Sequence, residues 1–400
     1  MKGLDQTSSL SHVIAAWPPE LRLLLSLAGP GRASVVKTQP AEVKNWDEFL
    51  HLVARHRIAP AIYSGVRSTA GIPAHVAQTI EESFQRNRLV GLQRLREMVQ
   101  IHVALAEGGI PSIALKGGLA AIEIHGDLAR RDAGDDVDVL VQPEHFQVAD
   151  RLLREFNFQP RSLDFPINNS RLRWVLRQAC EKKYFQPDSG ALIELHWRLM
   201  RNPRLLTIET SELFAQARIV RVGGQPVRAL SFDHQLLFLC VHGADHAWFR
   251  LSWLLDIAQL LKGMDLIAIA KVENLFAAYG LNRVLHQAVS LAQDLFNSNL
   301  APEMVKRARS DSDAAWLSHQ ALTEIARSIR HPQSASLTER FNRHSYALAL
   351  REGFRYAMTH LRQAGLCPDD WSDLPLPAGF ERLYYGLRPV LWLLRRWRSA

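Results

Sequence analysis

Two aspartates separated by one valine have a spacing that suggests metal chemistry. Asp136 and Asp138 stand in the run Asp-Val-Asp-Val-Leu-Val, whose apolar character predicts a buried strand over residues 137–141. Side chains alternate between the two faces of a strand, so both carboxylates should project from the same face. Two carboxylates on one face suit a hard divalent cation such as Mg²⁺. The competing interpretation is a pair of solvated aspartates at a strand edge.

A third carboxylate, Glu194, lies in the otherwise apolar run Leu-Ile-Glu-Leu-His-Trp. A charged side chain in such a strand is costly unless it is paired or binds a metal. Alternation puts Glu194 and His196 on one face. We therefore predict that Asp136, Asp138 and Glu194 bind metal ions and carry catalysis, as carboxylates do in two-metal sites. The alternative is an ion pair between Glu194 and an arginine such as Arg198.

A glycine turn and nearby basic residues suggest a phosphate site. Lys116, Gly117 and Gly118 stand between a predicted strand and a predicted helix. Glycines allow close approach of a phosphate, and a helix N-terminus offers free N–H groups. Lys116 supplies a point charge, and Arg131 a fork of donors suited to phosphate. The alternatives are a purely structural turn and an exposed arginine pair, Arg130 and Arg131.

The surrounding sequence predicts the elements that would position these residues. Short apolar runs predict strands over 110–115 and 137–141, and a hairpin joins 182–186 to 191–199 around a Pro-Asp-Ser-Gly turn. Helical patterns dominate the rest of the chain, apart from a second hairpin over 219–229. The predicted division is a helical region over 1–95, a core over 96–200, a helical region over 201–366, and a linker with a basic tail over 367–400.

The composition is that of a globular protein in a reducing compartment. Hydrophobic residues make up 47% of the 400 residues and charged residues 22%. The three cysteines show no zinc-binding or paired spacing, and neither a signal peptide nor an apolar membrane span is apparent. We therefore expect a cytoplasmic location. A net charge of +8 suits a polyanionic partner or only aids solubility. We find no nucleic-acid motif and expect no nucleic-acid partner.

Two further groups of residues allow functional and structural interpretations. His242, Asp245 and His246 are grouped on a predicted helix, and packing or hydrogen bonding is the simpler explanation for them. Residues 381–400 are basic and aromatic, a pattern typical of a helix that contacts a membrane surface, of a docking segment, or of a helix that packs on its own domain.

Taken in order, these motifs resemble those of the uncharacterised bacterial nucleotidyltransferase family of the polymerase-β-like superfamily. The similar segments are Leu115-Lys116-Gly117, Arg130-Arg131, 136–141, 194–197, 54–60, 242–248 and 253–257. The resemblance covers about residues 40–265. It implies an α+β fold, in which a small mixed sheet of nucleotidyltransferase type is embedded in N- and C-terminal helical regions.

The resemblance also implies Mg²⁺ and a nucleoside triphosphate, with an unidentified small molecule, glycan or peptide as acceptor. Lys116, Gly117, Gly118, Arg131 and His196 would then bind the nucleotide. The chain departs from the superfamily pattern because Lys-Gly-Gly replaces the usual Gly-Ser turn. Two other hypotheses stay open: a non-catalytic nucleotide-binding or scaffolding protein, and a phosphotransferase that uses the same metal site.

Overall fold

The chain forms two compact units whose segments alternate along the sequence. In this computed structural model the described residues are 10–28, 38–161, 169–327, 337–365, 370, 373–377 and 379–398. The helical unit contains Met1–Gln93, Gly118–Ala133 and Phe232–Glu352, and the sheet unit contains Arg94–Gly117, Gly134–Ser231 and Gly353–Ala400. Within the described ranges, no helix combines the length and the apolar character that a membrane span requires.

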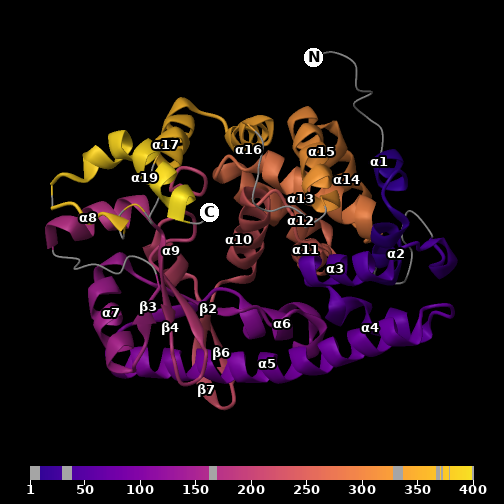
Figure 1. Ribbon diagram of the computed structural model, residues 1–400, viewed down its shortest axis with the longest axis horizontal. Helices are drawn as coiled ribbons and strands as arrows, with labels where there is room; N and C mark the ends of the chain where they lie inside the picture. Colours follow the sequence, from indigo (N-terminus) through magenta and orange to yellow (C-terminus); the bar gives the residue numbers. More distant parts are fainter. Residues whose placement is uncertain are drawn as a thin grey trace. The chain divides into compact units, whose positions relative to one another are not determined.

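A seven-stranded mixed sheet with the order β3-β4-β5-β2-β1-β7-β6 forms the middle of the sheet unit (Figure 1). The strands are β1 (Ser112–Ala114), β2 (Asp136–Val141), β3 (Gln159–Pro160), β4 (Glu181–Phe185), β5 (Leu192–His196), β6 (Arg218–Val222) and β7 (Gln225–Ala229). The predicted α+β class with a small mixed sheet is therefore confirmed.

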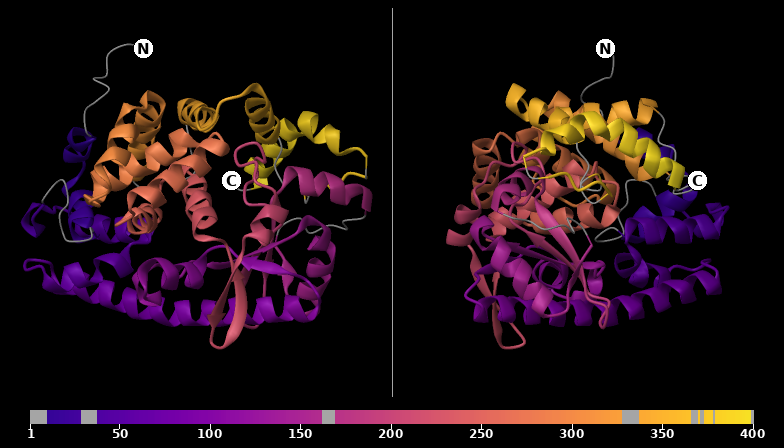
Figure 2. Two further views of the ribbon diagram at one scale, coloured as in Figure 1. Left: turned by 180° about the vertical axis from the view of Figure 1, so that it is seen from behind. Right: turned by 60° about the vertical axis from the view of Figure 1, so that its left-hand side comes forward.

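The sheet extends beyond the core that the sequence predicted over residues 96–200. The hairpin β6–β7, at the bottom of each view in Figure 2, is also part of the sheet. Its strand β7 pairs with β1 in the parallel direction. Sequence patterns locate a hairpin but not its distant partner strand, so this pairing was missed. The predicted four-part division of the chain stays a prediction.

Strand β2 lies in the centre of the sheet, as its apolar sequence predicted. It pairs antiparallel with β1 and parallel with β5. Val137, Val139 and Val141 are buried on one face. The opposite face of the same strand carries Asp136 and Asp138. Asp136 and Asp138 therefore lie on one face of a strand whose backbone is hydrogen-bonded to a neighbouring strand on each side.

The valine face of the sheet is covered by α7 (Phe146–Glu155). The ring of Phe146 lies 4.7 Å from the ring of Trp197, which directly follows β5. Asp150 of α7 accepts hydrogen bonds from Tyr184 and from Lys182, whose Nζ lies 2.7 Å from its Oδ1. The Lys182 side chain is fully buried, so its charge depends on this carboxylate.

The other helical segments of the sheet unit surround this core. They are the last turns of α5 (Ala74–Glu107), η3 (Pro143–His145), α8 (Asn169–Gln178), α9 (Thr210–Ala215), α17 (Phe354–Ala364), η4 (Glu381–Leu383) and α19 (Tyr384–Arg398). The indole N–H of Trp197 donates to the carbonyls of Leu176 and Ala179, which ties the end of α8 to the end of β5.

The helical unit is built almost entirely from α-helices. They are α1 (Ser11–Ala15), α2 (Pro19–Ala28), α3 (Trp46–His56), α4 (Ala59–Ser68), the first part of α5, α6 (Gly117–His125, apart from Gly117), α10 (Phe232–Asp245), α11 (Leu251–Leu261), α12 (Leu266–Ala278), α13 (Asn282–Phe296), α14 (Pro302–Ser310), α15 (Ser312–Ala326) and α16 (Leu337–Ala349), with the short turns η1 (Pro40–Glu42) and η2 (Leu128–Arg130).

The histidines grouped near the end of α10 pack among aromatic rings. The ring of His242 lies 4.8 Å from that of His246 and 5.1 Å from that of Trp253. The ring of His246 lies 5.5 Å from Trp253. No group of metal-ligating atoms is found around these histidines within the described residues. The packing interpretation therefore agrees with the structure.

The C-terminal segment forms the helix α19 and exposes much of its apolar surface. Leu393 is 58% exposed and Trp397 is 86% exposed. Residues 399 and 400 of the predicted tail lie outside the described residues. The membrane contact proposed for 381–400 stays a prediction.

We expect Asp150→Ala to destabilise the protein by about 2–4 kcal/mol, because it removes the carboxylate paired with a buried ammonium. Urea unfolding followed by circular dichroism would measure the loss. The matched control is the double variant Asp150→Ala/Lys182→Met, which removes both charges and should recover at least half of that loss. Equal destabilisation in the single and double variants would contradict the importance of the buried pair.

Candidate functional site

The register between β2 and β5 brings three carboxylates to one face of the sheet. Asp138 stands opposite Glu194 in this parallel pair, and Asp136 stands two residues earlier on β2. The charge of Glu194 is close enough to Asp136 to help raise its pKa. The carboxylates of the predicted metal site therefore meet, although Glu194 is separated from them by more than fifty residues of chain.

Asp138 is held by two cationic side chains. The Nζ atom of Lys116 lies 2.9 Å from Oδ1 of Asp138, and Nε2 of His196 lies 3.1 Å from the same oxygen. Lys116 comes close because β1 pairs with β2 and the backbone N–H of Leu115 donates to the carbonyl of Asp138. Asp138 is 5% exposed, so these contacts replace much of the water that would otherwise solvate the carboxylate.

Glu194 is paired with a lysine from the neighbouring strand. Lys183 stands opposite Glu194 in the β4–β5 hairpin and donates a hydrogen bond to it. The alternative pairing with Arg198 was wrong, since the Arg198 guanidinium donates to backbone carbonyls, including that of Leu176. Nε2 of His196 lies 3.6 Å from the other oxygen of Glu194.

The three carboxylates titrate differently because their neighbours differ. Burial, together with the charges of Asp138 and Glu194, raises the pKa of Asp136 to about 6. Burial also opposes ionisation of Asp138, but Lys116 and His196 outweigh it and hold the pKa of Asp138 well below its usual range. In the same way burial is outweighed at Glu194, where the nearby imidazole of His196 helps to lower the pKa to about 2.

The cations of the site are stabilised in return. Burial disfavours a charged imidazole, yet the hydrogen bond to Asp138 and contacts with Cys180 and Glu194 raise the pKa of His196 well above its ordinary value. Burial likewise opposes the charge of Lys116, but Asp138 and Asp136 raise the pKa of the ammonium group. The site therefore combines three acidic groups with the cations Lys116, Lys183 and His196.

The glycine turn opens α6 directly after Lys116. Gly117 has φ +74°, a conformation that favours glycine, and an added Cβ there would meet no atom within 4 Å. Gly118 is the second residue of α6 and is buried. The helix start after a strand is therefore as predicted from the sequence, while phosphate binding by Lys116, Gly117 and Gly118 stays a prediction.

Arg131 makes a buried ion pair within the helical unit. Its Nε lies 2.8 Å from Oδ2 of Asp256, and Nε2 of His125 lies 2.8 Å from Oδ1 of the same residue. Although burial disfavours the charge of Asp256, Arg131 and His125 lower its pKa. The phosphate-binding role of Arg131 stays a prediction.

Sequence reasoning missed three residues of this face: Cys180, Glu181 and Lys183. Glu181 stands opposite His196 and Lys183 stands opposite Glu194, which places both on this face. Cys180 directly precedes β4, and its sulfur lies within 4.8 Å of ligand atoms of Glu181 and His196. The register of the predicted hairpin was the signal that could have found Lys183, because oppositely charged residues across a strand pair attract. The sequence contains no comparable pattern for Cys180 and Glu181, because their closeness to His196 follows only from the hairpin register.

The carboxylate set is chemically suited to a hard divalent cation. Oxygen ligands from Asp138 and Glu194 and a ring nitrogen from His196 lie within 4.8 Å of one another. Burial and the neighbouring charges of Asp138 and Glu194 raise the pKa of Asp136, since negative charge is crowded where solvent has been removed. A cation such as Mg²⁺ would relieve this crowding, so the residues fit the ion.

Comparison with known families places this chemistry in context. A family model described as uncharacterised nucleotidyltransferase matches residues 42–297, more than half of the chain. The chain belongs to this nucleotidyltransferase family. The match includes β2, β5 and the three carboxylates. Nucleotidyltransferases generally use divalent metals, which agrees with the oxygen-rich face of the sheet.

A solved structure is also similar to the chain. It is described as an antigenic nucleotidyltransferase-like protein from Paracoccidioides brasiliensis, with 16% identity, a TM-score of 0.27, and coverage of 46% of this chain and 88% of that chain. Comparison with curated proteins gave no match.

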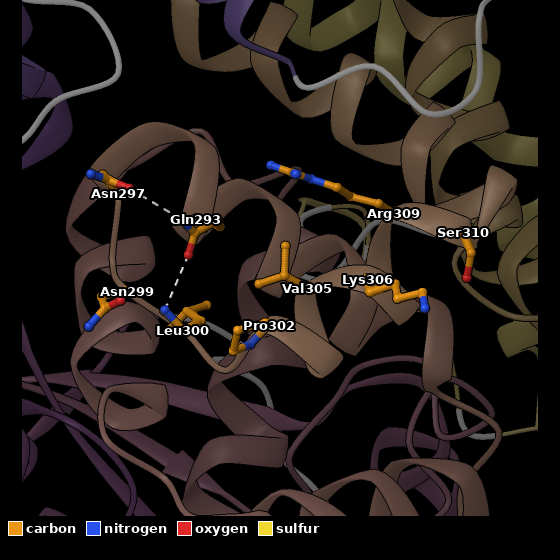
Figure 3. A pocket seen from close by; sticks show the side chains of 9 residues that line it. All are labelled: Gln293, Asn297, Asn299, Leu300, Pro302, Val305, Lys306, Arg309 and Ser310. Atoms are coloured by element: carbon orange, nitrogen blue, oxygen red, sulfur yellow. Dashed lines mark hydrogen bonds between the residues drawn. The ribbon is translucent and has the colours of Figure 1, made fainter.

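A separate hollow lies in the helical unit, between the end of α13 and α14 (Figure 3). Gln293 bridges its wall by donating to Asn297 and accepting from the backbone N–H of Leu300. Lys306 and Arg309 line it, and none of the three carboxylates of β2 and β5 does. It therefore contributes nothing to the metal chemistry described above.

We expect Asp136→Asn to stabilise the metal-free protein in a pH-dependent way. Asp136 has a raised pKa in the folded state, so ionising it costs stability as pH rises from about 4 to about 6. Asn avoids this cost. The variant should match the wild type near pH 4 and exceed it by about 3 kcal/mol above pH 7. Unfolding titrations at both pH values would measure the difference, and a gain that is equal at both would contradict the assignment.

Proposed function

We propose that this protein is a Mg²⁺-dependent nucleotidyltransferase that moves a nucleoside monophosphate from a nucleoside triphosphate to an acceptor, with release of pyrophosphate. The observation that carries the proposal is the meeting of Asp136, Asp138 and Glu194 on one face of a central sheet, in a chain of the nucleotidyltransferase family. The acceptor class, a small molecule, glycan or peptide with a hydroxyl or phosphate, rests on the family resemblance.

Asp136 and Asp138 would hold the nucleotide-associated ion, and Glu194 would complete the set on the acceptor side. Bound Mg²⁺ would neutralise triphosphate charge and lower the pKa of the acceptor hydroxyl. In the metal-free protein Lys116, Lys183 and His196 balance the same carboxylates. We infer that these cations let the site fold without metal.

Lys116 would have two partners in turn. Its ammonium group contacts Asp138 beside the start of α6. A metal at Asp138 would weaken that attraction and leave the lysine available for a phosphate oxygen. Gly117 and Gly118 would supply backbone N–H groups at the helix start. His196 would orient Asp138 by donating from Nε2.

The reaction class is tested by label position. The protein is incubated with Mg²⁺, cell extract and each of the four nucleoside triphosphates, labelled at the α- or the γ-phosphate. Transfer of the α-label to an acceptor supports nucleotidyl transfer. Transfer of the γ-label would identify a phosphotransferase instead. Nucleotide binding without transfer of either label would favour a non-catalytic binding or scaffolding protein.

We expect Lys116→Ala to weaken the affinity for Mg²⁺-nucleotide by about tenfold, because a cation next to the phosphates is lost. Lys183→Ala is the matched control, since it removes an equal charge beside Glu194 but away from the glycine turn. Its affinity should change by less than about threefold. Isothermal titration calorimetry measures both. Equal losses in the two variants would indicate a general charge effect rather than phosphate binding.

We expect Glu194→Gln to separate binding from chemistry. Nucleotide affinity should stay within about tenfold of the wild type, because Asp136 and Asp138 are retained. Label transfer should slow by about 10² or more, because the carboxylate that completes the metal set is lost. Both are measured on one preparation.

Asp135→Asn is the matched control for Glu194→Gln. Asp135 is exposed and directly precedes β2, so this variant removes a nearby negative charge from outside the predicted set. Its transfer rate should stay close to that of the wild type. Unimpaired transfer in Glu194→Gln would remove this residue from the catalytic set.

A further inference from the structure

His196 has a second ring nitrogen that the nucleotidyltransferase proposal does not use. Its Nε2 lies against Asp138, whereas Nδ1 is buried and makes no hydrogen bond to any described residue. The side chain is 4% exposed. A buried polar atom without a hydrogen-bond partner is costly, so the direction in which Nδ1 points is informative.

Nδ1 of His196 faces a thiol and a carboxylate. It lies 3.6 Å from Oε2 of Glu181, and Sγ of Cys180 lies 3.7 Å from the same oxygen. Ligand atoms of all three residues lie within 4.8 Å of one another. Cys180 directly precedes β4, and Glu181 is the strand partner of His196, so the hairpin backbone fixes the arrangement.

These separations are close to those of a tetrahedral metal site. Bond lengths of about 2.3 Å to sulfur and about 2.0 Å to nitrogen or oxygen place neighbouring tetrahedral ligands about 3.3–3.5 Å apart. The two separations to Oε2 of Glu181 therefore exceed these values by only a few tenths of an ångström, and all three ligand atoms lie within 4.8 Å of one another. The other oxygen of Glu181 is held by Lys183 at 3.1 Å, which orients the carboxylate and leaves Oε2 directed at Cys180 and His196.

The type of ligand distinguishes this cluster from the three carboxylates on β2 and β5. Thiolate and imidazole suit borderline-soft ions, whereas Mg²⁺ prefers oxygen. The contact between Nε2 of His196 and Asp138 is also typical of such metal sites. A metal-bound histidine almost always donates its other N–H to a carboxylate or carbonyl group.

We propose that Cys180, Glu181 and His196 form a binding site for a borderline-soft divalent cation of the Zn²⁺ type, with water as the remaining ligand. Binding displaces the thiol proton of Cys180 and the Nδ1 proton of His196 to solvent, and the ion takes both freed electron pairs. The ion fixes the imidazole so that Nε2–H is directed at Asp138. The proposed site and the carboxylate set thus lie on opposite sides of the His196 ring, and both contain this histidine.

Metal titration of the full-length protein tests this proposal without nucleotide or turnover. Co²⁺ is the probe, because cobalt bound to a thiolate gives a charge-transfer absorption band that oxygen ligands do not give. Wild-type protein stripped with a chelator should develop this band with one equivalent of Co²⁺, and one equivalent of Zn²⁺ should abolish it. Absence of a thiolate band in the wild type would overturn the proposal.

Variants locate the ion. Cys180→Ser should lose the band and weaken Zn²⁺ binding by about 100-fold or more, since one of three protein ligands is replaced. Glu181→Gln should keep the band but bind more weakly. Cys240→Ala is the matched thiol control and should keep both band and affinity, because Cys240 is buried in α10. A band that persists in Cys180→Ser, or disappears in the control, would contradict the site.

Two further measurements separate this site from the carboxylate set and from misfolding. Asp136→Asn should retain the cobalt band, because Asp136 contributes no ligand to it. Loss of all Co²⁺ binding in that variant would place the ion at the carboxylates and overturn the proposal. Zn²⁺ should raise the melting temperature of the wild type but not of Cys180→Ser, whose metal-free melting temperature should match that of the metal-free wild type. A Zn²⁺-induced rise of equal size in Cys180→Ser would also contradict the site.

Discussion

The crowding of three carboxylates on one face of the sheet is the interaction on which the rest of the site depends. Asp136, Asp138 and Glu194 approach one another where burial has removed most of the solvent that would stabilise their charge. Lys116 and His196 compensate at Asp138, and Lys183 compensates at Glu194. Asp136 receives less compensation and has a raised pKa. The same imbalance that costs stability favours a divalent cation.

Two adjacent lysines of strand β4 point to opposite faces of the sheet. Lys183 faces the carboxylates, whereas Lys182 is buried against Asp150 on the face covered by α7. Strand alternation makes this division inevitable once the register is set. A slip of one residue would turn Glu181 to the face covered by α7 and the buried Tyr184 to the carboxylate face. The alternation of polar and buried residues along the hairpin therefore helps to specify its register.

Membership of the nucleotidyltransferase family and the donor set are both compatible with a divalent cation at the carboxylates. The proposed soft-cation site would place a second metal ion next to the carboxylates. His196 stands between the two sets, with Nε2 directed at Asp138 and Nδ1 directed at Glu181. An ion on one side of the ring would then orient a ligand of the ion on the other. Such coupling needs no moving part, because both contacts are made by one rigid imidazole.

The sequence by itself determined the strands, the hairpins and the shared face of Asp136 and Asp138, because alternation and turn chemistry are local properties of the chain. It also indicated Glu194, since a charge within an apolar strand demands a partner. Only the tertiary structure decided which partner each group has. Local patterns do not encode the parallel pairing of β2 with β5, the contact of Lys116 with Asp138, or the pairing of β7 with β1. The approach of Cys180 to His196 follows from the register of the β4–β5 hairpin, which only the structure gives. The pairing of Arg131 with Asp256 depends on segments distant in sequence, whose meeting is fixed by burial of the core rather than by any one motif.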